Sequence, residues 1–423
     1  MDLPKGWAVS NFEDTVQVLD TFREPINNTK RMQRIEGKQK NELYPYYGAT
    51  GLVGYIDGYL LDGEYVLLGE DGAPFLDASA NKAYIVKGKV WVNNHAHVLL
   101  SCLSNRFLCY YLNQLDYKEY VSGTTRLKLT QGSMKRMPII MPPLAEQHRI
   151  VAKIDALFSE LVKGVEMLST VRKQLRTYRQ AALKWAFEGK LSGNTETLFC
   201  TVSMKDIVLQ YQNGISKRNG NVGIKYKVLR LSDLENFRIT EKSPRFIDLT
   251  ESEIKKYNLL PNDLVLIRVN GSKELVGRLI IITNEHEWAY CDHFIRVRLQ
   301  PRMAFSPYIR HLFDSKQIRG LISHKMVSTA GQNTISQTSI NELFLPLPSV
   351  EVQKQIVAEI ESRLSVCDKL EQLVDECLGK ARALKQSILK KAFTGQLVPQ
   401  DPDDEPAEEL LKRIKQAQSV KPK

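Results

Sequence analysis

One stretch of the chain occurs twice, 206 residues apart, and this duplication limits the fold more than any other feature. Residues 142–151 read PPLAEQHRIV, and residues 348–357 read PSVEVQKQIV. The same shift of 206 aligns Gln180 with Gln386, and it aligns the sequence GKL at 189–191 with GQL at 395–397. A single register held over more than 50 residues indicates a tandem duplication.

Both copies predict a long helix, because apolar residues recur at alternating spacings of three and four. The first seam consists of Ile150, Ile154, Leu157, Leu161, Gly164, Leu168, Val171, Leu175, Tyr178, Ala182 and Trp185. The second consists of Ile356, Ile360, Arg363, Cys367, Leu370, Val374, Cys377, Ala381, Leu384 and Ile388. About five heptads of this pattern favour a coiled-coil pair, which we expect to be antiparallel, with Gly164 and Arg363 as weak points or polar register markers. Prolines precede each helix, and Gly189 and Gly395 end them.

The repeat divides the chain into five parts. We predict a first globular head at 1–143, a first long helix at 144–195, a second head at 196–347, a second long helix at 348–398 and a tail at 399–423. Strand-like runs at 65–68, 83–86 and 97–100 precede a helix at 105–120 in the first head. Runs at 263–267, 276–282 and 294–299 precede a helix at 307–326 in the second head. The expected fold class is α+β, with two α/β heads, two long antiparallel helices and a pseudo-twofold relation from the tandem repeat.

Positive charge is concentrated in parts of the chain. The net charge is +11 over 423 residues. No carboxylate lies between Glu119 and Glu146, and Asp314 is the single one between Asp292 and Glu342. Such stretches favour contact with phosphate groups, although a solvated basic face would have the same composition. The cluster Lys30, Arg31, Arg34, Lys38 and Lys40 is predicted to grip phosphate or to form a mobile loop.

Several classes of protein are excluded by composition and motifs. No run of 18 apolar residues is present, and six cysteines without a CxxC pair indicate a reduced, cytoplasmic compartment. We find no phosphate-binding loop and no adenine-methyltransferase NPPY or NPPF sequence, and the histidines lack metal-ligand spacing. Asp248, Glu253 and Lys255 resemble a nuclease set, but they are better explained as an exposed helix start. The chain is therefore expected to have no catalytic residues and no metal.

The DNA-contact candidates are polar residues of types that read base edges, and those of the loops at 124–128 and 332–334 lie in the acid-free stretches. In the first head they are Asn93, Asn94, His95, Thr124, Thr125, Arg126 and Lys128. In the second head they are Arg268, Asn270, Ser272, Arg296, Gln332, Asn333 and Thr334. Two alternatives stay open: the asparagine pairs could simply form hairpin turns, and Arg296 with Arg298 could line a solvated sheet face.

In combination, the motifs resemble those of the specificity subunits of Type I restriction–modification enzymes, over nearly the whole chain. The motifs are LPKGW at 3–7, YYGATG at 46–51, GEDG at 69–72, VNNH at 92–95, LIRVNGS at 266–272, STAGQNTI at 328–335 and GQLVPQDP at 395–402. The resemblance implies two target recognition domains, each reading half of an asymmetric, interrupted site in double-stranded DNA. It also implies two methyltransferase subunits docked on the helices, which bind S-adenosylmethionine and methylate adenine. A motor-nuclease subunit, using ATP and Mg²⁺, would cut unmodified DNA.

Two other functions are compatible with the residues alone. The chain could be a DNA-processing enzyme with an unrecognised active site, or a coiled-coil scaffold that does not touch DNA. For the tail, residues 410–414 predict a short amphipathic helix against the first head, and a disordered end is the alternative.

Overall fold

The computed structural model describes residues 3–102, 104–189, 199–220, 222–235, 238–240, 242–283 and 288–419. These residues form two compact units. The first unit contains Met1–Ser169 and Asp375–Lys423, and the second contains Thr170–Val374. Each unit therefore combines one globular head with part of both long helices, and the chain leaves the first unit after Ser169 and returns to it at Asp375.

The first head is built on a mixed six-stranded sheet with the strand order β2-β7-β5-β6-β3-β4. Its strands are β2 (Val16–Val18), β3 (Tyr44–Gly48), β4 (Gly51–Ile56), β5 (Leu61–Gly69), β6 (Ala83–Val92) and β7 (Ala96–Ser101). Neighbouring strands are antiparallel except β3 and β6, which run parallel with Tyr46 opposite Trp91. The three predicted runs are confirmed as parts of β5, β6 and β7.

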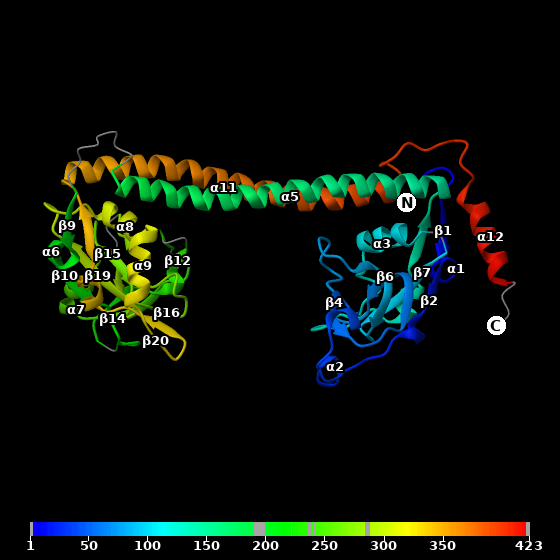
Figure 1. Cartoon of the computed structure of the whole chain (residues 1–423), viewed down its shortest axis with the longest axis horizontal. Helices are drawn as coiled ribbons and strands as arrows, with labels where there is room; N and C mark the ends of the chain where they lie inside the picture. The colour runs from blue at the N-terminus through cyan, green and yellow to red at the C-terminus, as the bar shows by residue number, and fades with distance from the viewer. Residues whose placement is uncertain are drawn as a thin grey trace. The chain divides into compact units, whose positions relative to one another are not determined.

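Short elements surround this sheet (Figure 1). They are β1 (Ala8–Asn11), α1 (Phe12–Thr15), η1 (Asp20–Phe22), α2 (Asn28–Ile35), η2 (Lys40–Glu42), α3 (Asn105–Gln114), α4 (Gln131–Lys135) and β8 (Pro138–Met141). Strands β1 and β8 form a two-stranded antiparallel ribbon that leads into the first long helix. Helix α3 is shorter than the predicted 105–120, because it ends at Gln114 before the extended residue Leu115.

The second head repeats the first plan in smaller sheets. The sheet orders are β10-β19-β15-β17, β14-β11-β18 and β16-β21-β20, together with the ribbons β22-β9 and β12-β13. Their bounds are β9 (Cys200–Ser203), β10 (Val208–Asn213), β11 (Ile224–Leu229), β12 (Leu234–Glu235), β13 (Arg238–Ile239), β14 (Arg245–Leu249), β15 (Leu264–Ile267), β16 (Val269–Asn270), β17 (Leu279–Ile281), β18 (Trp288–Tyr290), β19 (Phe294–Leu299), β20 (Val327–Thr329), β21 (Gln332–Thr334) and β22 (Phe344–Leu347). A parallel pairing also recurs, because β11 runs parallel to β18 with Lys227 opposite Trp288.

Six short helical segments complete the described part of the second head. They are α6 (Met204–Ile207), η3 (Leu231–Asp233), α7 (Glu251–Tyr257), α8 (Ser306–Asp314), α9 (Lys316–Lys325) and α10 (Gln337–Asn341). The predicted single helix at 307–326 is wrong. Ser315 adopts an extended conformation between α8 and α9, and its hydroxyl accepts a hydrogen bond from the Ile318 amide, which caps α9.

The two predicted long helices are α5 (Leu144–Phe187) and α11 (Val350–Phe393), each 44 residues long. At 1.5 Å per residue each helix extends about 66 Å. In the first unit, Ile150 and Ile154 near the start of α5 share a core with Ile388 and Phe393 near the end of α11. In the second unit the ends are reversed, and Phe187 of α5 shares a core with residues at the start of α11. The predicted antiparallel pairing is thereby confirmed within each unit.

The predicted seam is only partly buried, because Val171, Tyr178 and Leu370 in the middle of the helices are 38–42% exposed and other seam residues are exposed nearer the helix ends. Trp185 is 46% exposed and Leu384 is 50% exposed, although the heptad pattern places both inside. Ala186 and Phe187 are buried in the core of the second head, and Leu389 is buried in that of the first head. Near its C-terminal end, each helix therefore buries residues against a head. The strict heptad pattern does not predict which residues are buried there.

The two long helices have the same residues at their starts and just after their ends, a glutamine and a glycine at positions 206 residues apart. Gln147 and Gln353 are fully buried, and their side-chain amides donate to Pro142 O at 2.9 Å and to Pro348 O at 2.8 Å. Gly189 and Gly395, which follow the helices, have φ angles of +74° and +72°. That left-handed conformation favours glycine, as the sequence predicts for both helix ends.

The C-terminal tail forms α12 (Ala407–Ser419), which lies against β1 and α1 of the first head (Figure 1). Ala407 and Leu410 are buried there, and the Ala407 amide donates to Gly6 O at 2.9 Å. Arg149 of α5 forms an ion pair with Asp404 of the tail at 2.5 Å. The predicted tail helix against the first head is confirmed. Within the part of the chain that the structure describes, no helix is both long and apolar enough to cross a membrane.

Candidate nucleic-acid interface

Three motifs of the first head, far apart in sequence, meet beyond the C-terminal end of β5. The Glu70 amide donates to His95 O at 2.8 Å, and the Leu129 amide donates to Glu70 O at 2.8 Å. The Gly72 amide donates to Leu127 O at 2.9 Å. The strand end at 69–72, the turn at 93–95 and the acid-free loop at 124–128 therefore form one surface.

Side chains of opposite charge meet on this surface. Arg126 Nε lies 2.8 Å from Asp71 Oδ1, and Lys128 Nζ lies 3.4 Å from Glu70 Oε1. His95 Nδ1 lies 3.5 Å from Asp71 Oδ2. Arg126 and Lys128 are 60% and 51% exposed, so both cations stay accessible to a polyanion while they are paired.

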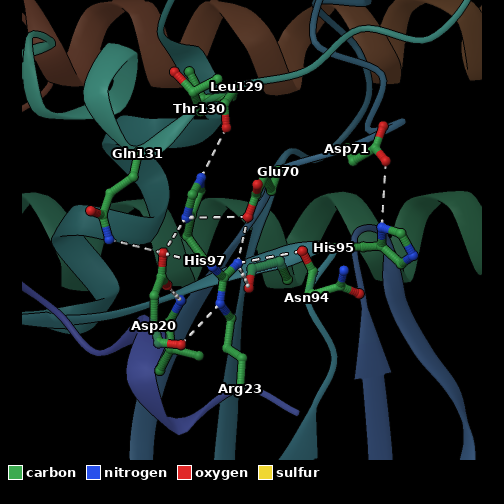
Figure 2. Close-up of polar contacts among 12 residues, drawn as sticks. Asp20, Arg23, Glu70, Asp71, Asn94, His95, His97, Leu129, Thr130 and Gln131 are labelled. Carbon is green, nitrogen blue, oxygen red and sulfur yellow. Dashed lines mark hydrogen bonds and ion pairs between the residues drawn. The ribbon is translucent and has the colours of Figure 1, made fainter. Parts of the chain in front are cut away.

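A half-buried network supports this surface from the side of η1 (Figure 2). His97 Nδ1 lies 2.6 Å from Asp20 Oδ2, and its other ring nitrogen lies 2.9 Å from Leu129 O. Arg23 lies between two carboxylates, 3.1 Å from Asp20 and 2.5 Å from Glu70. Burial alone would raise the pKa of Asp20, but the hydrogen bonds from His97 and the Val98 amide and the charges of His97 and Arg23 lower it below its ordinary value. The network therefore connects η1, strand β7 and Leu129, the residue after the loop, to Glu70.

The second head has the same backbone frame. The Arg268 amide donates to His293 O at 2.7 Å, as Glu70 does to His95 O. The Ile335 amide donates to Arg268 O at 3.0 Å, as Leu129 does to Glu70 O. Strand β16 pairs with β21, with Asn270 opposite Asn333. The candidate segments at 268–272 and 332–334 are therefore brought together, and the frames of the two heads differ in their side chains.

The asparagines of these frames hold the backbone. Asn93 is buried, and its side chain accepts from the His95 amide at 2.8 Å. Asn270 accepts from the Ser272 amide at 2.8 Å, which is the turn geometry of the alternative interpretation. Asn333 is also buried, and its amide donates to Gly271 O at 2.9 Å. These three residues shape the turns; Asn93 and Asn333 are buried, and Asn270 is half-buried.

The exposed candidates form the outer surface of each head. They are Asn94, Thr124, Thr125, Arg126 and Lys128 in the first head, and Ser272 and Gln332 in the second. His95, Arg268 and Thr334 are half-buried. Their side-chain contacts with DNA stay a prediction.

Arg296 requires a correction, because neither a DNA contact nor a solvated sheet face describes it. Its side chain is 1% exposed, and its guanidinium donates to Asn258 O at 2.8 Å and to Lys256 O at 3.2 Å. Arg298, on the same strand face as predicted, lies 2.7 Å from Asp263. Both arginines therefore anchor the segment after α7 to β19. The alternation of charged and apolar residues in β19 could not reveal that another segment covers the charged face.

Two further clusters lie outside the candidate surfaces. In the basic cluster, Arg34 and Lys38 both pair with Asp57, at 2.6 and 2.8 Å, and Lys30, Arg31 and Arg34 belong to α2. In the nuclease-like set, Glu253 and Lys255 lie in α7, which confirms the expected helix start for these two, whereas Asp248 lies in strand β14. Glu253 closes a capping box with Thr250 at the start of α7.

Two groups bring possible metal ligands together. The ligand atoms of Asp20, Glu70 and His97 lie within 4.8 Å of one another, but the Arg23 guanidinium already supplies positive charge there. Cys291, Asp292 and His293 form the second group, and burial raises the pKa of the Cys291 thiol, which disfavours the thiolate that a metal needs. Neither arrangement favours a metal.

Sequence reasoning missed Asp20, Arg23, Glu70 and Asp71 as residues of the first surface. The motif GEDG at 69–72 was the available signal, but two carboxylates argue against DNA contact when they are considered alone. Their partners Arg126 and Lys128 lie more than 50 residues away, and a single sequence gives no sign of this pairing.

The chain has a duplicated α+β fold, and its two heads present polar, cation-bearing surfaces on one common backbone frame. These features define a class of duplicated proteins with two candidate nucleic-acid interfaces. Residues 4–167 match the family model described as the Type I restriction modification DNA specificity domain. The chain is 31% identical over 336 residues to the StySPI specificity subunit of Salmonella potsdam, which covers 75% of this chain and 73% of that one. It is 30% identical over 329 residues to the EcoKI specificity subunit of Escherichia coli K12, covering 73% and 71%. The chain belongs to the family of Type I restriction enzyme specificity subunits.

Solved structures agree on the fold. A structure from work on complex assembly and conformational transition of the type I R-M system aligns with a TM-score of 0.68 at 17% identity, covering 94% of this chain and 100% of that chain. The HsdS subunit from Thermoanaerobacter tengcongensis aligns with a TM-score of 0.54 at 16% identity, covering 94% and 98%.

Proposed function

We propose that this chain is the non-catalytic recognition subunit of a Type I restriction–modification complex, and that each head reads one half of a bipartite DNA site. The observation that carries the proposal is the frame present in both heads. In each one, the acid-free loop is hydrogen-bonded to the residue after the central strand, β5 or β15, and the surrounding side chains differ. A conserved frame with different polar side chains suits two readers of different sequences.

The partners follow from the family. Two methyltransferase subunits dock on α5 and α11 and methylate adenine with S-adenosylmethionine, and a motor-nuclease subunit uses ATP and Mg²⁺ to cut unmodified DNA. This chain holds none of these cofactors and acts in the cytoplasm. Exposed apolar residues on α5 and α11 support docking. Met167 and Val366 are 69% and 56% exposed, although each lies in a long helix beside its partner.

The length of the helices should set the spacing between the half-sites. We propose matched deletions of seven residues, 161–167 from α5 and 376–382 from α11, which keep the two helices in register. The preferred number of spacer base pairs should change while both half-sites stay the same. Deleting residues 161–167 alone is the control, because it breaks the pairing without shortening both helices. An unchanged spacer preference in the matched deletion would refute the role of the helices as a spacer.

The decisive test is the methylation pattern of a randomised DNA library. The chain assembled with its modification subunits should methylate adenine within one bipartite motif, and the chain alone should transfer no methyl group. Methyl transfer or cleavage by the chain alone would support a DNA-processing enzyme. DNA binding that does not depend on salt concentration would support a scaffold without phosphate contacts.

A further inference from the structure

Arg126 of the first head is an exposed arginine whose side chain is nevertheless held in place. Its Nε lies 2.8 Å from Asp71 Oδ1, and the side chains of the two residues are 60% and 24% exposed. Asp71 is itself held on its other oxygen by His95 Nδ1 at 3.5 Å. Among the residues that the structure describes, Asp71 is the one ion-pair or hydrogen-bond partner of the Arg126 guanidinium. A pair made through Nε leaves the two terminal amines of the guanidinium available.

The loop that carries Arg126 is clamped at both sides. Ser122 and Lys128 exchange two backbone hydrogen bonds, at 2.8 and 3.0 Å, and the Gly72 amide donates to Leu127 O at 2.9 Å. The backbone on either side of Arg126 is therefore attached to itself and to the end of β5. An arginine on such a loop loses little freedom when it binds, which favours specificity.

A glycine makes room for the guanidinium. Gly72 has a φ angle of +75°, and a Cβ built on it would lie 2.9 Å from Arg126 Nε and 3.5 Å from Cζ. Any side chain at position 72 would therefore collide with the guanidinium or displace it from Asp71. The glycine thus has two reasons to be present, the left-handed conformation and the close approach of Arg126.

The second head lacks this arrangement. The equivalent of Asp71 is Val269, which follows from the matching hydrogen bonds of both residues to His95 O and His293 O at 3.4 Å. The equivalent of Arg126 by the shift of 206 is Gln332. The paired arginine is therefore a feature of the first head and is not required by the common frame.

We propose that Arg126 reads a guanine in the half-site of the first head, and that Asp71 is the positioning residue that aims it. Guanine presents two neighbouring acceptors, O6 and N7, in the major groove, and the two terminal amines of arginine match them. A phosphate contact would need the charge but not the fixed orientation, which Asp71, His95 and Gly72 together supply. The proposal rests on the proposed function, since it assumes that the first head reads DNA.

The test measures base preference at each position of the site. The chain assembled with its modification subunits is incubated with a randomised duplex library, and bound duplexes are sequenced for the wild type and for Arg126→Lys, Asp71→Asn and Gly72→Ala. Arg126→Lys keeps the positive charge but lacks the two terminal amines of the guanidinium. Discrimination at one G·C pair should fall roughly 5- to 150-fold, with the other half-site unchanged. Asp71→Asn and Gly72→Ala should relax the same pair, and Asp71→Glu should restore part of the preference.

Arg413→Lys is the matched control. Arg413 is 59% exposed and pairs with Glu405, as Arg126 pairs with Asp71, but it belongs to the tail helix α12. Its substitution should leave every base preference unchanged.

Three outcomes would overturn the proposal or its basis. Equal weakening of all sequences by Arg126→Lys, with no change in preference, would make Arg126 a phosphate contact. If Arg126→Lys changes the base preference and Asp71→Asn does not, Asp71 is not a positioning residue for Arg126. A wild-type complex that selects no bipartite motif would refute the proposed function itself. If Arg126→Lys fails to assemble, Asp71→Asn and Gly72→Ala still test the same base pair.

Discussion

Gln147 and Gln353 occupy the same place in the two repeats, but only one of them holds a head to its helix. Gln353 donates from Nε2 to Pro348 O at 2.8 Å and to Met303 O at 2.9 Å, and it accepts from the Phe305 amide at 2.8 Å. Gln147 donates to Pro142 O at 2.9 Å, and its Oε1 is buried without a partner among the described residues. We therefore expect substitution by methionine to have unequal costs at the two sites.

The difference can be worked out from the groups that lose a partner. Gln353→Met leaves three backbone groups without this side chain, one in a buried contact and two in part-buried contacts. An unsatisfied buried group costs about 1–3 kcal/mol, so the free energy of unfolding should fall by about 3 kcal/mol. Gln147→Met removes one such contact and also a buried unpaired oxygen, so its cost should be about 1 kcal/mol. For units of this size, these costs correspond to falls in Tm of about 6–12 °C and about 2–4 °C.

Differential scanning calorimetry and hydrogen exchange measure the two consequences separately. Calorimetry of both variants gives the thermal shifts. Peptide-level exchange should show faster exchange at the Phe305 amide in Gln353→Met and no change there in Gln147→Met, which makes each variant the control for the other. Equal thermal shifts in the two variants, or an unchanged exchange rate at Phe305, would refute the reasoning.

Three further predictions concern stability. Burial lowers the pKa of His311 to about 4 from 6.5, so the unfolded state binds the proton first. The free energy of unfolding should therefore fall as pH drops from about 6.5 to about 4, and His311→Gln should remove about 2 kcal/mol of the difference between urea titrations at pH 7 and pH 5. Gly379→Ala in α11 should stabilise the protein by about 1 kcal/mol in thermal unfolding, because nothing lies within 4 Å of the added Cβ. Gly395→Ala should destabilise the protein by about 1–2 kcal/mol or more, because the φ angle of Gly395 is +72° and the added Cβ would collide with Pro4. Arg149→Ala should free the tail by removing its ion pair with Asp404, and limited proteolysis should then release α12 faster than in the wild type.

Much of the candidate surface could be located from the sequence, but the roles of its residues could not be assigned. The acid-free stretches point to the loops at 124–128 and 332–334, because a lack of carboxylates is visible in one sequence, and their role in DNA contact stays a prediction. The amide groups of Asn93, Asn270 and Asn333 suggest base contacts, but all three side chains form hydrogen bonds within their own head. An amide that caps a turn and an amide that reads a base are the same residue type, and the difference lies in what surrounds them.

The sequence by itself determined the duplication, the two long helices, the glycines that end them and the α+β class of the heads. These properties follow from repeats and from helical spacing, which are local along the chain. The tertiary structure alone decided that Arg296 is interior, that Trp185 and Leu384 leave the seam, and that Asp71 meets Arg126. Each of these outcomes depends on a segment distant in sequence that covers or approaches the residue, and local pattern contains no information about which segment that is.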